Sequence, residues 1–194
     1  LTNPATGGSA AQGTRLVYVQ WFNGATWSPV TADSIVLDTA APTTTAPTSA
    51  FSVGSTLGSE LATTPIPVVL SWSGADATSG ISSYELQVSV DGGTPTISST
   101  TGTTMPQSLI AGRQYSYGVR ATDRAANIGA WATGAPFSVS LTQESDPALA
   151  FTGTWASEAS TTASGGATQF TTDPGATVAF TFTGRSVAWV APPQ

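Results

Sequence analysis

The sequence contains no cysteine, no histidine and no lysine among its 194 residues, and these absences remove much of the chemistry open to a protein. Serine and threonine are plentiful, but the chain has no histidine or lysine base to activate a hydroxyl nucleophile. Zinc loses its cysteine and histidine ligands, and no disulfide framework can form. We therefore expect a non-catalytic chain with no catalytic residues, no metal site and no cofactor.

Charge is scarce as well, because charged residues make up only 8% of the chain. Eleven carboxylates against five arginines give a formal net charge of -6, and an acidic surface repels phosphate groups. No stretch approaches the roughly 18 apolar residues of a membrane span. Nucleic acid is thus an unfavourable partner, and we expect no membrane span.

Patterns typical of helices are close to absent, whereas patterns typical of strands recur. Residues 68–72 place Val68, Leu70 and Trp72 on one face of a strand. Residues 84–90 alternate between apolar and polar side chains, so Tyr84 and every second residue after it should point inward. A turn of Asp91, Gly92 and Gly93 follows, which predicts a hairpin.

The second half of the same region continues this alternation. Tyr115, Tyr117, Val119 and Ala121 should face inward, and a turn at residues 123–129 leads to Trp131. The count of about seven strands is that of a two-sheet sandwich. Six of the expected strands lie around residues 47–53, 68–72, 84–90, 105–109, 115–121 and 136–141, and the hairpin turn at residues 91–93 implies one more.

Residues 43–49, rich in threonine and proline, have two interpretations. Their composition is that of a semi-extended linker that carries O-linked sugars, and it equally suits the first edge strand of a domain. We favour the edge strand, because proline is tolerated on edge strands and at strand starts.

Residues 109–121 resemble the fibronectin type III pattern of Leu, Gly, then Tyr-x-aromatic-x-Val-x-Ala, and Trp72 matches that family's buried strand-B tryptophan. The resemblance implies that the Tyr115 hydroxyl bonds back to nearby backbone. Bacterial immunoglobulin-like repeats share turns of the type at residues 79–81 and 123–127, so both families stay open. The expected fold class is all-β: a fibronectin III/immunoglobulin-like sandwich with incomplete β segments at both ends.

The start of the chain repeats part of this region. Residues 13–37 contain, in weaker form, the order of residues 112–131 followed by a strand. Residues 38–42 resemble the boundary between tandem bacterial immunoglobulin-like domains. We therefore expect residues 1–38 to be the C-terminal hairpin of a preceding immunoglobulin-like domain and residues 39–141 to be the sandwich.

Residues 142–194 are expected to form the opening strands of a further β domain. Val178, Phe180 and Phe182 share one face, and Val187 and Trp189 are expected on the strand that follows. The segment resembles the start of the galactose-binding-like jelly rolls found in exoproteins.

Two acidic turns are candidates for calcium. Residues 76–80 and 123–127 place oxygen ligands in turns, but neither turn stacks three carboxylates, and Asp and Asn also stabilise turns by bonding their own backbone. A glycosidase needs two carboxylates about 5 to 10 Å apart, and Glu85, Asp91, Asp76 and Asp123 are available, but so small a sandwich seldom has the cleft that a sugar chain requires. We expect the acidic residues to be structural.

Aromatic side chains are the remaining candidates for ligand binding, since they stack on sugar rings. Trp21, Phe22, Trp27 and Trp131 lie at strand ends or in loops, where most such aromatics cap a sandwich or fill a domain junction. We take Trp27 and Trp131 as the candidate ligand-binding residues.

The sequence as a whole favours a non-catalytic extracellular spacer or display module of a tandem-repeat bacterial surface or secreted protein. Such a module mediates adhesion or domain presentation, and its partners are neighbouring domains or identical subunits, with glycans as a further option. Two alternatives stay open: a carbohydrate-binding accessory region of an exoenzyme, and a subunit of an extracellular filament completed by strand exchange between subunits.

Overall fold

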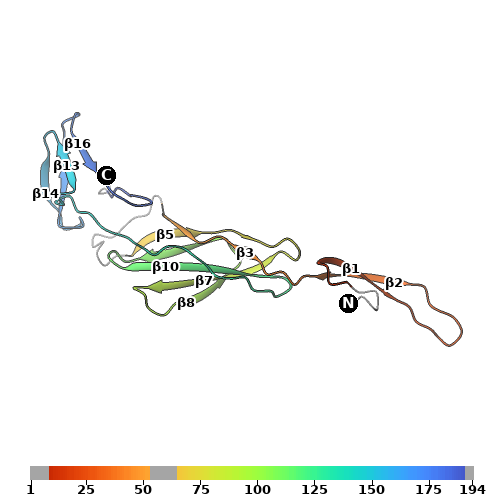
Figure 1. Ribbon diagram of the computed structural model, residues 1–194. Helices are drawn as coiled ribbons and strands as arrows, with labels where there is room; N and C mark the ends of the chain where they lie inside the picture. Colours follow the sequence, from red (N-terminus) through yellow and green to blue (C-terminus); the bar gives the residue numbers. More distant parts are fainter. Residues whose placement is uncertain (1–8, 53–64, 191–194) are drawn as a thin grey trace.

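The computed structural model describes residues 9–52 and 65–190, and these form an all-β chain of strands β1 to β16. The strands lie in three groups that follow one another along the molecule, with β1 and β2 at one end and β13 to β16 at the other (Figure 1). This confirms the expected fold class at the level of an all-β protein. No helix in the described residues is long and apolar enough to cross a membrane.

The central group has a sandwich-like arrangement of antiparallel sheets. One sheet has the order β4-β5-β9, and the other has the order β11-β10-β7-β8, with β12 also paired to β10. The first sheet consists of β4 (Thr48–Phe51), β5 (Ile66–Ser71) and β9 (Thr104–Leu109). The second consists of β7 (Ile81–Val90), β8 (Thr96–Thr100), β10 (Gln114–Asp123), β11 (Ala132–Thr133) and β12 (Phe137–Ser138). A short pair, β3 (Thr43–Thr44) and β6 (Gly74–Ala75), lies beside them.

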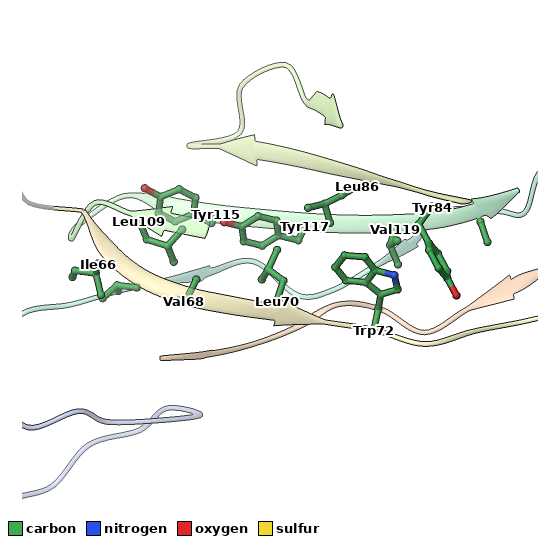
Figure 2. Close-up of a cluster of buried hydrophobic side chains, with 12 residues drawn as sticks. Ile66, Val68, Leu70, Trp72, Tyr84, Leu86, Leu109, Tyr115, Tyr117 and Val119 are labelled. Atoms are coloured by element: carbon green, nitrogen blue, oxygen red, sulfur yellow. The ribbon is translucent and has the colours of Figure 1, made fainter. Parts of the chain in front are cut away.

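The core lies between β5 and β10, because alternate residues of each strand point toward the other sheet (Figure 2). Val68, Leu70 and Trp72 are 3%, 1% and 7% exposed, which confirms the predicted inward face of β5. The inward residues of β7 and β10 are also as predicted, with Val88 and Val90 partly buried against the cluster. The buried members from these two strands are Tyr84, Leu86, Tyr115, Tyr117, Val119 and Ala121.

Two local predictions in this group are confirmed. Asp91 and Gly92 have φ angles of 51° and 72° between β7 and β8, so the Asp-Gly pair forms the expected hairpin turn. The Tyr115 hydroxyl accepts a hydrogen bond of 2.8 Å from the backbone N–H of Ile110. This bond is the corner contact that the fibronectin III resemblance implied.

Edge segments differ more from expectation. Residues 43–49 contain β3 and the start of β4, which confirms the edge-strand interpretation. The last strand, expected over residues 136–141, is reduced to the two residues of β12, because Ser138 already lies opposite Gln114, where β10 begins, and β10 does not extend further to pair with residues 139–141. Val53, the expected end of the opening strand, lies outside the described residues.

A separate two-stranded ribbon precedes the sandwich. Strands β1 (Gly13–Val19) and β2 (Thr31–Leu37) pair antiparallel, from Gly13 opposite Leu37 to Val19 opposite Thr31. A bridge between Phe22 and Trp27 continues the ribbon toward its tip. The predicted hairpin at the start of the chain is therefore present and extends away from the sandwich (Figure 1).

The third group contains two further ribbons. Strand β13 (Leu149–Thr152) pairs with β16 (Thr177–Phe180), and β14 (Ala156–Ala159) pairs with β15 (Ala167–Phe170). The prediction of a strand around Val187 and Trp189 is wrong. Residues 181–190 contain no strand, and the side chains of Val187 and Trp189 are 59% and 73% exposed. Their alternation alone does not form a strand, since no neighbouring strand in the described part of the chain accepts their backbone hydrogen bonds.

Candidate functional site: a carboxylate cluster between hairpin and sandwich

Three aspartates from distant parts of the sequence meet where the hairpin joins the sandwich. Asp38 follows β2, Asp76 follows β6 and Asp123 ends β10. Each offers a carboxylate oxygen, and these oxygens all lie within 4.8 Å of one another. Asp38 is 7% exposed and Asp123 is 2% exposed, so the cluster is largely withdrawn from water.

Asp38 is held through both its side chain and its backbone. One carboxylate oxygen accepts the N–H of Ala40 at 3.0 Å, and the other accepts the N–H of Ser79 at 3.0 Å. The Asn127 side-chain amide donates to the Asp38 carbonyl at 3.2 Å. One residue between hairpin and sandwich is thus bonded to two loops of the sandwich.

The other two carboxylates fold those loops. Oδ1 of Asp76 accepts the N–H groups of Thr78, Ser79 and Gly80 at 3.1, 2.9 and 2.8 Å. Oδ1 of Asp123 accepts the N–H groups of Ala125 and Asn127, both at 2.8 Å, and its Oδ2 accepts the Asn127 side-chain amide at 2.7 Å. Each of these carboxylates therefore holds its own turn closed by accepting several N–H groups of that turn.

In the described part of the chain, hydrogen-bonding neighbours, and not an arginine, act on the charge of Asp38. The two ion pairs found among residues 9–52 and 65–190 join Arg113 to Asp91 and Arg120 to Glu85, so neither involves the cluster. The neighbouring Ser79 hydroxyl lowers the pKa of Asp38 below its ordinary value, burial opposes this, and the amides of Ala40 and Ser79 lower the pKa further. Asp38 is therefore an anion at neutral pH.

The sequence did not predict that these three aspartates meet. Each acidic turn alone lacks three carboxylates, as expected, but the structure brings the two turns together and adds Asp38. Oxygen ligands of this type suit calcium, while the amide hydrogen bonds give the same carboxylates a structural role. The sequence signal that could have pointed to Asp38 was its place at the start of the boundary segment 38–42.

The two predicted ligand-binding tryptophans lie in different β groups. Trp27 is 63% exposed near the hairpin tip, where its ring centroid is 5.0 Å from that of Phe22. Trp131 is half-buried in the sandwich, and the Arg120 guanidinium lies 4.6 Å above its ring. The structure therefore leaves Trp27 open to a ligand and covers one face of Trp131.

The carboxylates considered for sugar hydrolysis are engaged elsewhere. Glu85 accepts from Arg120 at 2.6 Å, and Asp91 accepts from Arg113 at 2.5 Å. Asp76 and Asp123 do come together, but in the amide-bonded cluster.

Comparison of the chain with protein-family models, with curated proteins and with solved structures gives no match.

Proposed function

We propose that this chain is a non-catalytic extracellular spacer and display module of a tandem-repeat bacterial surface or secreted protein. One observation carries the proposal: Asp38 ties the hairpin to two loops of the sandwich through its carboxylate and its carbonyl. A spacer must hold successive β units in a fixed relation, and hydrogen bonds from the connecting residue to two loops of the sandwich favour such a relation.

Packing next to Asp38 supports a stiff joint. Pro42 is buried, and a Cβ placed on Gly129 would lie 2.4 Å from the Pro42 carbonyl oxygen. The loop after β10 therefore lies directly against the connecting segment. A glycine is needed at this close approach because any side chain would push the two segments apart.

The central unit is in this proposal a fibronectin III or immunoglobulin-like sandwich. Three features support that assignment: the three-stranded order β4-β5-β9, the facing order β11-β10-β7-β8, and the bond from Ile110 to the Tyr115 hydroxyl. Domains of this type serve as repeated structural units, which agrees with a spacer role.

The absence of cysteine makes the joint simple to measure, since spin labels attach only where cysteines are introduced. We suggest labels at exposed Ala32 in β2 and exposed Ser99 in β8, followed by electron–electron resonance distance measurement. A narrow distance distribution is expected for the otherwise unchanged chain. Asp38→Ala should broaden it, whereas the matched variant Asp33→Ala, in an exposed position of β2, should not. Equally broad distributions in all three proteins would refute a fixed joint.

The exposed aromatics at the hairpin tip favour carbohydrate binding as a second candidate function. Trp21, Phe22 and Trp27 are 64%, 54% and 63% exposed, and residues 16–32 contain no charged side chain. An uncharged aromatic surface suits the faces of neutral sugar rings. Tryptophan fluorescence during titration with neutral polysaccharides tests it: Trp27→Ala should abolish a saturable signal that Trp131→Ala retains.

A further inference from the structure

The hairpin repeats, in weaker form, the part of the sandwich that contains β10, and Gly13 and Tyr18 have the spacing of Gly112 and Tyr117. If Gly13 corresponds to Gly112, then Leu16 and Tyr18 occupy the positions of Tyr115 and Tyr117. In the sandwich, those two tyrosines are 6% and 3% exposed. In the hairpin, Leu16 and Tyr18 are 61% and 64% exposed. Side chains at equivalent positions are thus core in one copy of the pattern and uncovered in the other.

The strand neighbours differ in the same way. Strand β10 has β7 on one side, from Tyr115 opposite Val90 onward, and has β11 and β12 on the other. Strand β2 follows β1 in the chain as β11 and β12 follow β10, and it is the only strand paired with β1 in the described residues. The edge of β1 that corresponds to the β7 side of β10 is therefore open.

We propose that hairpin β1-β2 is a docking surface for an immunoglobulin-like half-sandwich, a set of strands equivalent to β5, β7 and β9. A β7-like strand with alternating apolar side chains pairs with the open edge of β1, and a β5-like strand covers Leu16 and Tyr18. In the sandwich these strands come before β10 in the chain, so a half-sandwich linked ahead of β1 reproduces the same connectivity. The proposal rests on the immunoglobulin-like assignment of the central unit.

The sandwich itself shows what such a partner provides. Val68, Leu70 and Leu109, from β5 and β9, lie over Tyr115 and Tyr117 (Figure 2). A half-sandwich would cover both exposed surfaces of the hairpin. Its β5-like strand would bury the apolar side chains on the face, and its β7-like strand would pair with the backbone groups on the edge of β1.

A second copy of this chain does not offer these strands. Its β7 already has β8 and β10 on its two sides, and its β5 has β4 and β9. A second copy would have to open its own sandwich to cover the hairpin. A partner with free β5-like and β7-like strands fits the surface without that cost.

A chimera tests the proposal with sequence from this same chain. Residues 39–111 are placed directly before Gly13 of the chain, so that the natural step from Ala111 to glycine is preserved. Hydrogen exchange is then followed at the β1 amides that point away from β2. We expect their exchange to slow by about tenfold or more, as expected when amides become part of a stable sheet. The same chimera with Leu16→Ser and Tyr18→Ser is the matched control and should show no slowing.

Two outcomes would overturn the inference. In one, the open-edge amides of β1 exchange in the chimera as fast as in the unmodified chain, while the β10 amides stay protected and show that the chimera has folded. In the other, the unmodified chain dimerises at micromolar concentration and Leu16→Ser with Tyr18→Ser abolishes the dimer, which assigns the surface to a second copy. Neither outcome changes the distance between labels at Ala32 and Ser99, so the stiff joint is judged separately.

Discussion

Tyr115 and Tyr117 lie two residues apart on one face of β10, yet their hydroxyl groups have opposite surroundings. The Tyr115 hydroxyl accepts the N–H of Ile110, whereas the Tyr117 hydroxyl is buried with no hydrogen-bond partner among the described residues. Burial, and to a smaller extent Tyr115, raises the pKa of Tyr117 to about 12. The two tyrosines therefore form a matched pair for measuring the value of one hydrogen bond.

We predict that Tyr115→Phe lowers the free energy of unfolding by about 1 kcal/mol, because the Ile110 N–H loses its acceptor. Tyr117→Phe should leave stability unchanged or raise it, because it removes a buried hydroxyl that has no partner. Urea denaturation of the two variants and the unmodified chain measures both changes. Equal losses in the two variants would contradict the assignment of the corner bond.

Asp38 predicts a dependence of stability on pH. Its pKa is lowered in the folded chain, so its contribution is complete above the ordinary value of 3.8 and is lost as the pH falls through the folded value. The difference in unfolding free energy between the unmodified chain and Asp38→Asn should therefore be constant above about pH 5 and should shrink below pH 4. A difference that stays the same down to pH 2 would show that the Asp38 charge has no role.

At the scale of elements, the contact between the loop after β10 and the connecting segment can be tested at Gly129. Gly129→Ala should destabilise the chain by about 1 to 3 kcal/mol, because the new methyl group meets the Pro42 carbonyl and the backbone cannot give way cheaply. Gly175→Ala is the control, since its methyl group meets only the Asp173 carboxylate at 3.5 Å. Thermal melting distinguishes the two variants, and similar melting temperatures would contradict the close approach.

The elements that the sequence predicted well are those whose signals are local. Alternation in β5, β7 and β10 identified the inward residues, because a half-buried strand needs no information beyond its own side chains. The carboxylate cluster could not be predicted in this way, since Asp38, Ser79 and Asn127 meet only after the chain has folded. The expected strand around Val187 failed for the related reason that a strand needs a partner as well as an apolar pattern.

At the scale of the whole molecule, the hydrogen bonds of Asp38 show that the stable central unit begins at or before Asp38. A piece containing residues 42–141 holds all strands of the sandwich, but it lacks the carboxylate that accepts the Ser79 N–H. We predict that residues 37–141 and residues 42–141 both fold and that the longer piece melts a few degrees higher. Circular dichroism during heating measures this, and Asp38→Ala in the longer piece should remove the difference. An unfolded spectrum for both pieces would contradict independent folding of the sandwich.

The pairing of the strands also determines how the molecule responds to a pulling force. Gly13 lies opposite Leu37, so tension applied at the two ends of the hairpin loads its hydrogen bonds one after another, and the ribbon unzips at low force. The sandwich is loaded differently: the chain enters beside Asp123 at one end of β10 and leaves through β12, opposite Tyr115, at the other. Tension along that direction loads the pairs that join β11 and β12 to β10 together, in shear. The hairpin should therefore extend first and protect the sandwich from rupture.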